Sequence, residues 1–250
     1  MGIIGVVAAL TIPNVNKNTN EAEKVAKVKK IYAELNEAHN RATAVYGPLN
    51  TWFYNDSISI DDDEDGQSCF NLHARYFNRL TEFMKLQKNC GCDDYCESST
   101  TGCMFDGYYK DVHGRDISKI DTTEFPRAIA AGNWSFCIIE FHKALPFKSF
   151  YGYPINKSAG FLYVDIDGPN KGKNSMGIDM FAFTITSDGI YPQGGGTEWT
   201  DSTIHTCASA GYYCTEWVIR NGNMDYLDAD ANGKCKHSNK TLSTTVSSCK

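Results

Sequence analysis

The chain has 250 residues, with 24 Lys and Arg against 30 Asp and Glu, which gives a formal net charge of −6 at pH 7. This length suffices for one large domain or two small ones with a real core, and the negative charge argues against a general nucleic-acid-binding surface. The 10 cysteines are many for a reducing cytosol, so we expect disulfides formed in an oxidising compartment.

Residues 1–13 carry no charge and almost no polarity. As a helix, Gly2 to Ile12 would rise about 16 Å, roughly half the core of a bilayer. The segment is therefore a core helix, the apolar part of a signal peptide, or the downstream half of a longer span. Lys17 is the first basic residue, which argues against a signal peptide. Pro13 is predicted to kink or break the helix.

Residues 14–46 have the pattern of an amphipathic helix that packs on a sheet. Apolar or semi-apolar residues recur at alternating steps of three and four, and Gly47-Pro48 ends the helix. A coiled-coil dimer is less favoured, because the seam contains Tyr, His and Ala. The stripe consists of Val25, Val28, Tyr32, Leu35, His39, Ala42 and Tyr46.

Residues 47–133 form an irregular region with a second predicted helix over Phe70–Leu86. The acidic run 61–66 begins like a calcium loop, but Leu72 stands where a bidentate Glu is required, so a solvated loop is favoured. A cluster of four cysteines follows at 90, 92, 96 and 103. Its C-x-C-x3-C-x6-C spacing does not match paired zinc knuckles.

Residues 134–250 have strand patterns and turn signals. Strands are predicted over 134–141, 161–166 and 181–186, because these stretches are rich in aromatic and β-branched residues. A hairpin is predicted from Thr215–Arg220 and Asn223–Leu227 about the dipeptide Asn221-Gly222. One long helix followed by short, tightly connected strands indicates an α+β fold with an antiparallel sheet.

Three separated motifs resemble type IV pilins and type II secretion pseudopilins. The first is the N-terminal GIIGVVAALTIP followed by the amphipathic helix. The second, YVDIDGPN from Tyr163 followed by Gly177, Asp179 and Phe181, is similar to a motif of pilin-like proteins, with one spacer missing. The third is WVIRNGNMDYL from Trp217. The resemblance implies a long N-terminal helix packed on a small antiparallel sheet, with residues 47–133 as a disulfide-rich variable insertion.

The family's prepilin leader, its cleavage site and its early acidic residue would all lie upstream of Met1, so the resemblance implies a prepilin-type N-terminus truncated at its start. Residues 1–13 then correspond to the remnant of a helix that anchors the subunit in the inner membrane and later packs in the filament core. The implied assembly residues are Ile3, Ile4, Val6, Val7, Leu10, Ile12 and Pro13.

The function implied is a structural subunit of a type IV pilus or a secretion pseudopilus, with a periplasmic domain and other pilin-like subunits as partners. The first alternative is a minor or tip pilin that binds a glycan, a surface or a secreted substrate, with Trp52, Trp134 and Trp199 as stacking candidates, although aromatics at these positions are more often core residues. The third reading is a secreted hydrolase. We expect no enzyme, since H-E-x-x-H, G-x-S-x-G and phosphate-loop motifs are all missing.

The second motif also contains a candidate Ca²⁺ site. Its oxygen donors are Asp165, Asp167, Asn170 and Asp179. Aspartates in a Gly-Pro turn suit Ca²⁺, and the resemblance supports this because several major pseudopilins bind calcium in a loop of the sheet. The favoured alternative is that these side chains cap the turn through its own backbone. Asp228, Asp230 and Asn232 form a second partial pattern that is also interpreted as a turn.

The cysteines are interpreted as disulfides. Cys207 and Cys214 can close a short loop, and the four clustered cysteines are expected to form local bridges in a periplasmic domain. Cys235 and Cys249 bracket the polar tail, as in the C-terminal disulfide loop of many pilins. These candidates are Cys90, Cys92, Cys96, Cys103, Cys207, Cys214, Cys235 and Cys249; Cys69 and Cys137 have no assigned partner.

Overall fold

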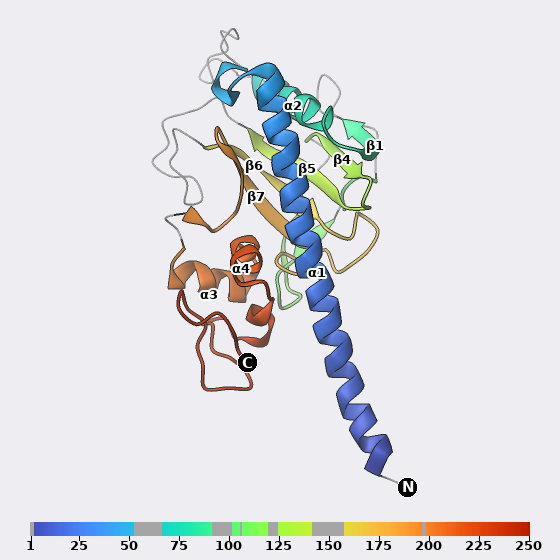
Figure 1. The fold of residues 1–250 in the computed structure, drawn as a ribbon, viewed down its shortest axis with the longest axis vertical. Coiled ribbons are helices and arrows are strands. Elements are labelled where there is room, and N and C mark those ends of the chain that lie inside the picture. Colours follow the sequence, from blue (N-terminus) through green and yellow to red (C-terminus); the bar gives the residue numbers. More distant parts are fainter. Residues whose placement is uncertain are drawn as a thin grey trace.

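The computed structural model describes residues 3–52, 67–91, 102–105, 107–119, 125–141, 158–196 and 199–250, and in the first helix it describes side chains from Thr19 onward. That helix, α1 (Ile3–Tyr46), crosses a six-stranded antiparallel sheet, and its N-terminal part projects beyond the domain (Figure 1). The predicted α+β class, with a long helix packed on an antiparallel sheet, is confirmed.

The sheet has the strand order β1-β4-β5-β6-β7-β8, and every neighbouring pair is antiparallel. The predicted strands at 134–141, 161–166 and 181–186 correspond to β5, β6 and β7. The sequence did not predict β4 and β8, because four residues are too few for a clear period-two pattern. The bounds are β1 (Leu86–Gly91), β4 (Arg127–Ala130), β5 (Ser135–Phe141), β6 (Ser158–Asp165), β7 (Met180–Thr186) and β8 (Gly189–Pro192); a separate hairpin pairs β2 (Tyr108–Lys110) with β3 (Asp116–Lys119).

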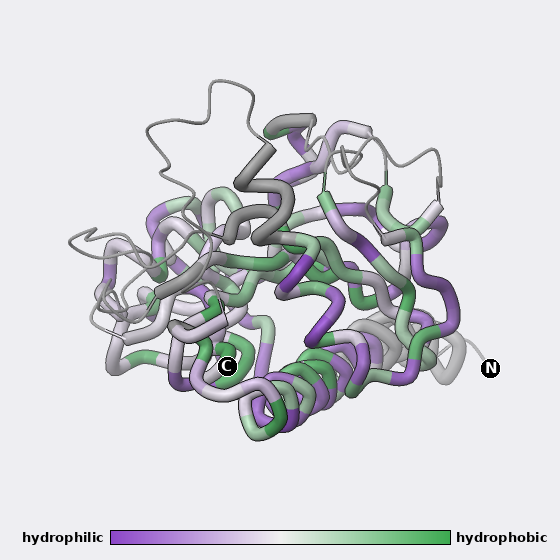
Figure 2. The backbone as a smooth tube through the Cα atoms, turned by 90° about the horizontal axis from the view of Figure 1, so that it is seen from above, coloured by the Kyte–Doolittle hydropathy of each residue, from purple (hydrophilic) through white to green (hydrophobic). Residues whose placement is uncertain are grey.

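One face of α1 is buried against the domain, as the predicted amphipathic stripe requires. Figure 2 shows hydrophobic and hydrophilic residues alternating along this helix. Burying a Val, Leu or Ile side chain fully stabilises the fold by about 1.5–3 kcal/mol, so this face holds α1 in place. The buried apolar residues of α1 are Val25, Val28, Ile31, Leu35, Ala38 and Ala42.

A polar contact also joins α1 to the edge of the sheet. Asn36 donates from Nδ2 to the carbonyl oxygen of Ile190 at 2.8 Å and accepts from the N–H of Ile190 at 3.0 Å. This side chain thus pairs with the backbone of edge strand β8 as a neighbouring strand would. At Ile190 the backbone N–H and carbonyl of this edge are therefore already paired.

The second helix, α2 (Gln67–Thr81), packs on β5, and the rings of Phe77 and Phe136 lie 5.8 Å apart. The predicted span of 70–86 was close but ran too far, because Leu86 begins β1. A short 3-10 helix, η1 (Leu49–Thr51), follows α1. At the end of α1, Gly47 has a φ of 84°, which favours glycine at a helix C-terminus.

The predicted hairpin at 215–227 is wrong. The segment instead forms helix α4 (Cys214–Asn221) and 3-10 helix η5 (Asp225–Asp228), preceded by an unpredicted helix α3 (Asp201–Ala210). Gly222 caps α4 with a φ of 66° and donates its N–H to the carbonyl of Val218. The Asn-Gly pair therefore ends a helix. Trp217 and Val218 are both fully buried, which fits a helical face and not the alternation of a strand.

Of the kink or break predicted at Pro13, the break is wrong, because α1 remains helical on both sides of this residue. A proline removes one N–H donor and crowds the preceding turn, but the hydrogen bonds of the flanking turns can keep a long helix continuous. In the part of the chain that the structure describes, no helix is both long enough and apolar enough to cross a bilayer.

Candidate functional site

The acidic turn between β6 and β7 is the most unusual polar feature of the domain. Asp165 ends β6 and Asp179 directly precedes β7, so the antiparallel pairing brings both to one end of the sheet. The N–H of Ile166 donates to the Asp179 carbonyl at 2.9 Å, which joins the two ends of the turn. Both carboxyl groups are fully buried. The sequence motif therefore corresponds to one structural unit.

Asp165 caps the start of this turn. Its Oδ1 accepts from the N–H groups of Asp167 at 3.0 Å and Gly168 at 2.9 Å. Its Oδ2 is buried and has no hydrogen-bond partner among the described residues. Burial raises the pKa of Asp165 to about 7, and the charges of Asp179 and Asp167 add to the rise, while the two backbone donors oppose it. Near neutral pH this carboxyl group therefore binds and releases a proton.

Asp179 organises the rest of the turn. Its Oδ1 accepts from the N–H of Ser175 at 2.6 Å, and its Oδ2 accepts from the N–H groups of Asn174, at 3.1 Å, and Lys173. Burial raises its pKa, although these donors and the Lys24 charge act in the opposite direction. Gly172 is required here: its φ is 75°, and a Cβ would lie within 3.0 Å of Asp179 Oδ2.

Two lysines of α1 face the acidic turn. The Nζ of Lys27 lies 3.6 Å from Asp167 Oδ1, and the Nζ of Lys24 donates to the Ile178 carbonyl at 3.1 Å. Because the Lys27–Asp167 pair is partly exposed, it contributes at most about 1 kcal/mol. The buried apolar face holds α1 in place, and these contacts show which part of it lies beside the turn. Sequence analysis did not identify either lysine, since only the tertiary structure places them beside these carboxylates.

The geometry supports turn capping for the residues proposed as a Ca²⁺ site. Three of the four carboxylate oxygens of Asp165 and Asp179 accept backbone N–H groups, and Asn170 is exposed. Within the described residues, no group of three or more His, Cys, Asp or Glu side chains is placed to hold a metal ion. The acidic run 61–66 lies outside those residues.

The second partial calcium pattern is an exposed turn. Asp230 Oδ1 accepts from the N–H groups of Asn232 at 2.8 Å and Lys234 at 3.0 Å. These hydrogen bonds lower the pKa of Asp230, because they stabilise the charged form at a position open to solvent. Asp165 and Asp230 thus each accept two backbone N–H groups through Oδ1, and their pKa values shift in opposite directions chiefly because Asp165 is buried and Asp230 is exposed.

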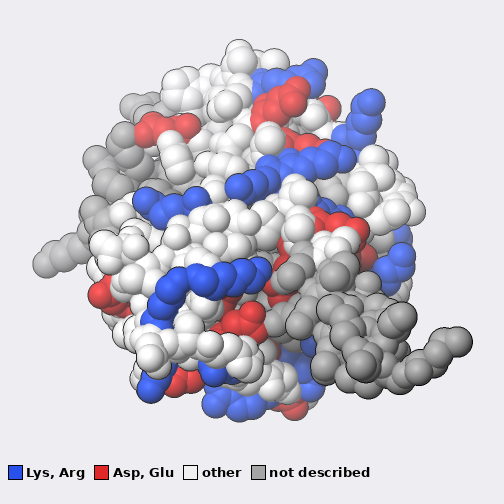
Figure 3. Space-filling view, turned by 60° about the horizontal axis from the view of Figure 1, so that its bottom comes forward, with Lys and Arg blue, Asp and Glu red and all other residues white. Residues whose placement is uncertain are grey.

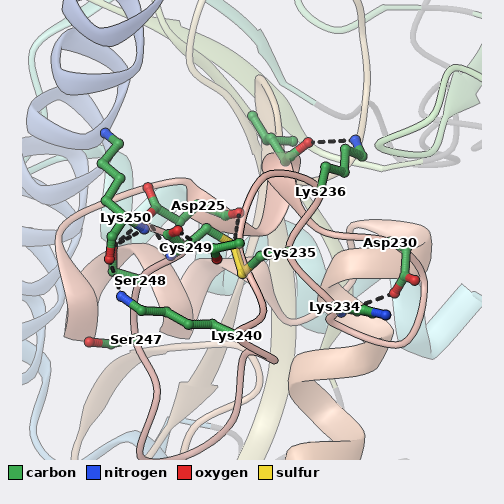
Figure 4. The surroundings of a disulfide bond; sticks show 12 residues. Asp225, Asp230, Lys234, Cys235, Lys236, Lys240, Ser247, Ser248, Cys249 and Lys250 are labelled. Carbon is green, nitrogen blue, oxygen red and sulfur yellow. Dashed lines mark hydrogen bonds between the residues drawn. A yellow bond between two sulfur atoms is a disulfide. The ribbon is translucent and has the colours of Figure 1, made fainter.

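The tail is fastened by a disulfide and by a buried carboxylate. Cys235 and Cys249 are bonded, and Asp225 Oδ2 accepts from the Ser248 hydroxyl at 2.7 Å and the Cys249 N–H at 2.9 Å (Figure 4). Cys207 and Cys214 join α3 to α4. Both predicted pairs are confirmed. The C-terminal segment is consequently a stapled unit attached to the sheet domain.

The remaining cysteines are resolved in part. Cys90 is bonded to Cys103, which confirms a local bridge within the predicted cluster. Cys92 and Cys96 lie outside the described residues, as does the side chain of Cys69. Cys137 is a buried free thiol, and burial raises its pKa, so the neutral thiol persists at ordinary pH.

His39 is an interface histidine, as its place on the packing face predicted. Its Nδ1 lies 3.0 Å from the Tyr76 hydroxyl, and its buried Nε2 has no hydrogen-bond partner in the part of the chain that the structure describes. Burial lowers the pKa of His39 to about 4. The ring is therefore neutral at pH 7 and ties α1 to α2.

The proposed sugar-stacking tryptophans are mostly core residues. Trp52 is 4% exposed and Trp134 is 2% exposed, so neither presents a face to a ligand, and that prediction is wrong for both. Trp199 is partly buried and is covered by the Arg220 guanidinium at 4.8 Å from the ring centroid. Large aromatic side chains fill the space between helix and sheet, because they bury the most apolar area.

The predicted assembly residues all belong to α1, but their side chains lie outside the described part. Comparisons with protein-family models, with curated proteins and with solved structures found no match to this chain.

Proposed function

We propose that the protein is a subunit of a type IV pilus or a type II secretion pseudopilus, assembled through its N-terminal helix. The observation that carries the proposal is that the two parts of α1 have different surroundings. Its C-terminal part packs on the sheet from Val25 onward, while its N-terminal part continues as helix away from the domain (Figure 1). A helix shared in this way joins a folded domain to an assembly.

The projecting part contains the most apolar segment of the sequence, residues 3–12. An apolar helix that leaves its own domain requires lipid or other protein surfaces, because exposing it to water is unfavourable. The inner membrane would provide the first environment and neighbouring subunits the second. This explains why a disulfide-stapled domain carries such a segment.

The experiment introduces a charge into the projecting helix in cells that naturally produce the protein. Leu10→Asp should reduce the subunit in the sheared filament fraction at least tenfold, because an Asp in an apolar helix environment costs about 2.5–3.5 kcal/mol. Ala22→Asp is the matched control, since it adds the same charge to the same helix at an exposed position. Quantitative immunoblotting of sheared and cell-bound fractions measures the effect.

Equal recovery of both variants in the sheared fraction would refute assembly through the helix. Mass spectrometry of the same wild-type fraction distinguishes the two classes of subunit. A major subunit dominates the filament protein, whereas a minor or tip subunit is present in trace amounts.

A further inference from the structure

Two adjoining cavities lie where α1 leaves the domain. Their volumes are about 310 and 330 Å³, and they share Val112, His113, Lys173 and Ile178, so they form one groove. On the α1 side the groove is lined by residues 20, 21 and 24, just before the first buried side chain of the helix, Val25. The groove therefore opens at the end of the domain from which the helix projects.

The charged residues that line this groove are mainly basic. They are Lys24, Lys110, Lys173 and Lys236, with Glu21 as the acidic residue and His113 beside them. Figure 3 brings this end of the molecule forward and shows lysine and arginine side chains lying across it.

Among the described residues, one of these lysines forms an ion pair with a carboxylate. Lys110 pairs with Asp116 at 3.0 Å, but Lys24 and Lys236 donate to backbone carbonyls of Ile178 and Leu227. In the described part of the chain, Lys24, Lys173 and Lys236 form no ion pair within 4.0 Å. The nearby Asp111 is occupied, since Arg115 donates to it from Nε at 2.5 Å.

Four residues of the groove lining are apolar, beside the polar Asn20 and Ser175. Val112, Ile178 and Leu227 are half-buried, and Met224 is buried. Lysines above an apolar floor match a ligand that carries an anionic group on a hydrocarbon body. A phospholipid headgroup with the first part of its acyl chains has this chemistry, and lysine acts as a point charge toward phosphate.

We propose that this groove binds the headgroup of an anionic phospholipid and seats the domain on the membrane that holds the apolar end of α1. The orientation rests on the proposed function, because that function places a membrane at the projecting helix. The lysines then determine how closely the domain approaches the bilayer before assembly.

The test measures binding of the full chain to vesicles of phosphatidylcholine, with and without about 30% phosphatidylglycerol, by flotation. The apolar helix contributes to both, so the ratio of the two affinities isolates the headgroup effect. Lys173→Gln with Lys236→Gln should reduce that ratio by about fivefold for each lysine removed. The matched control is Lys30→Gln with Lys85→Gln, two lysines that line a different cavity.

Equal ratios for the two double variants would overturn the proposal, as would a wild-type ratio near one. A second measurement, with inorganic phosphate and no vesicles, distinguishes a lipid headgroup from a free anion as the ligand. Phosphate binding would be shown by chemical shift changes that depend on Lys173 and Lys236. If these changes occur but vesicle affinity is the same with and without the two lysines, the groove binds a soluble anion and the lipid proposal is wrong. Lysine-dependent lipid preference together with intact assembly of Leu10→Asp would refute the filament proposal and leave the lipid site standing.

Discussion

Replacing Asp165 with asparagine should change the pH dependence of stability by about 3 kcal/mol between pH 5 and pH 8. The substitution keeps an oxygen for the N–H groups of Asp167 and Gly168. It removes the titration and the charge and replaces the buried Oδ2 by an amide NH2, whose burial cost is the same at both pH values and cancels when the two pH values are compared. The perturbation therefore reports how strongly burial opposes ionisation at the end of β6.

The sign follows from the two pKa values of this carboxyl group. In the folded state the pKa is raised to about 7 from the usual 3.8, so the folded protein binds more protons than the unfolded chain between these values. This contribution to stability is fully present below pH 3.8 and is lost as pH rises to about 7. From pH 5 to 7 the loss is about 2 pH units at 1.36 kcal/mol each, or about 3 kcal/mol.

The assay is urea unfolding of both proteins at pH 5 and pH 8 with the disulfides intact. At each pH, the unfolding free energy of wild type is subtracted from that of Asp165→Asn, which cancels the contributions of all other titrating groups. This difference should be larger, in favour of the variant, at pH 8 than at pH 5. Asp230→Asn is the control: its folded pKa is lowered below the usual 3.8, so this carboxyl group is ionised in both the folded and the unfolded state at pH 5 and pH 8, and its difference should be the same at both pH values. A difference for Asp165→Asn that is the same at both pH values would refute the argument.

Three further predictions concern other parts of the fold. Wild type should lose about 2 kcal/mol of unfolding free energy as pH falls from 6.5 to 5, because the folded His39 pKa is about 4, and His39→Asn should remove this loss. Urea unfolding of both proteins at the two pH values checks this, and equal losses in the two proteins would contradict it. Gly172→Ala should lower the melting temperature by more than Gly114→Ala does. Both glycines have positive φ, but only Gly172 lies against Asp179. The double variant Cys235→Ser with Cys249→Ser should lower the free energy of unfolding by about 3 kcal/mol and expose the tail to protease. An unchanged melting temperature would show that the Asp225 hydrogen bonds alone hold the tail.

Periodicity predicted the parts of the fold whose contacts are local. The stripe on α1 and the aromatic runs of β5, β6 and β7 were read correctly, because burial on one face imposes a period of 3.6 or 2. The segment from Thr215 was read as a strand because Trp217, Val218 and the following Asn-Gly suit both structures. Its packing against α1 and the disulfide at Cys214 select the helix.

For the acidic turn, the sequence motif predicts which residues lie together but not their hydrogen bonds or pKa values. The sequence identified Asp165 and Asp179 as one group and proposed both calcium binding and turn capping. The hydrogen bonds of the turn depend on which backbone N–H groups face inward, and the pKa shifts depend on burial beneath α1. Neither property can be read from spacing, since each depends on residues far apart in the chain.

By itself, the sequence determined the class of the fold, the long helix, three central strands and two of the disulfides. These depend on local periodicity and on cysteines close together in the chain. Only the tertiary structure decided that β8 is covered by Asn36, that Lys24 and Lys27 lie over the acidic turn, and that lysines from four segments line one groove. Such features arise from long-range packing, which brings together side chains that share no local pattern.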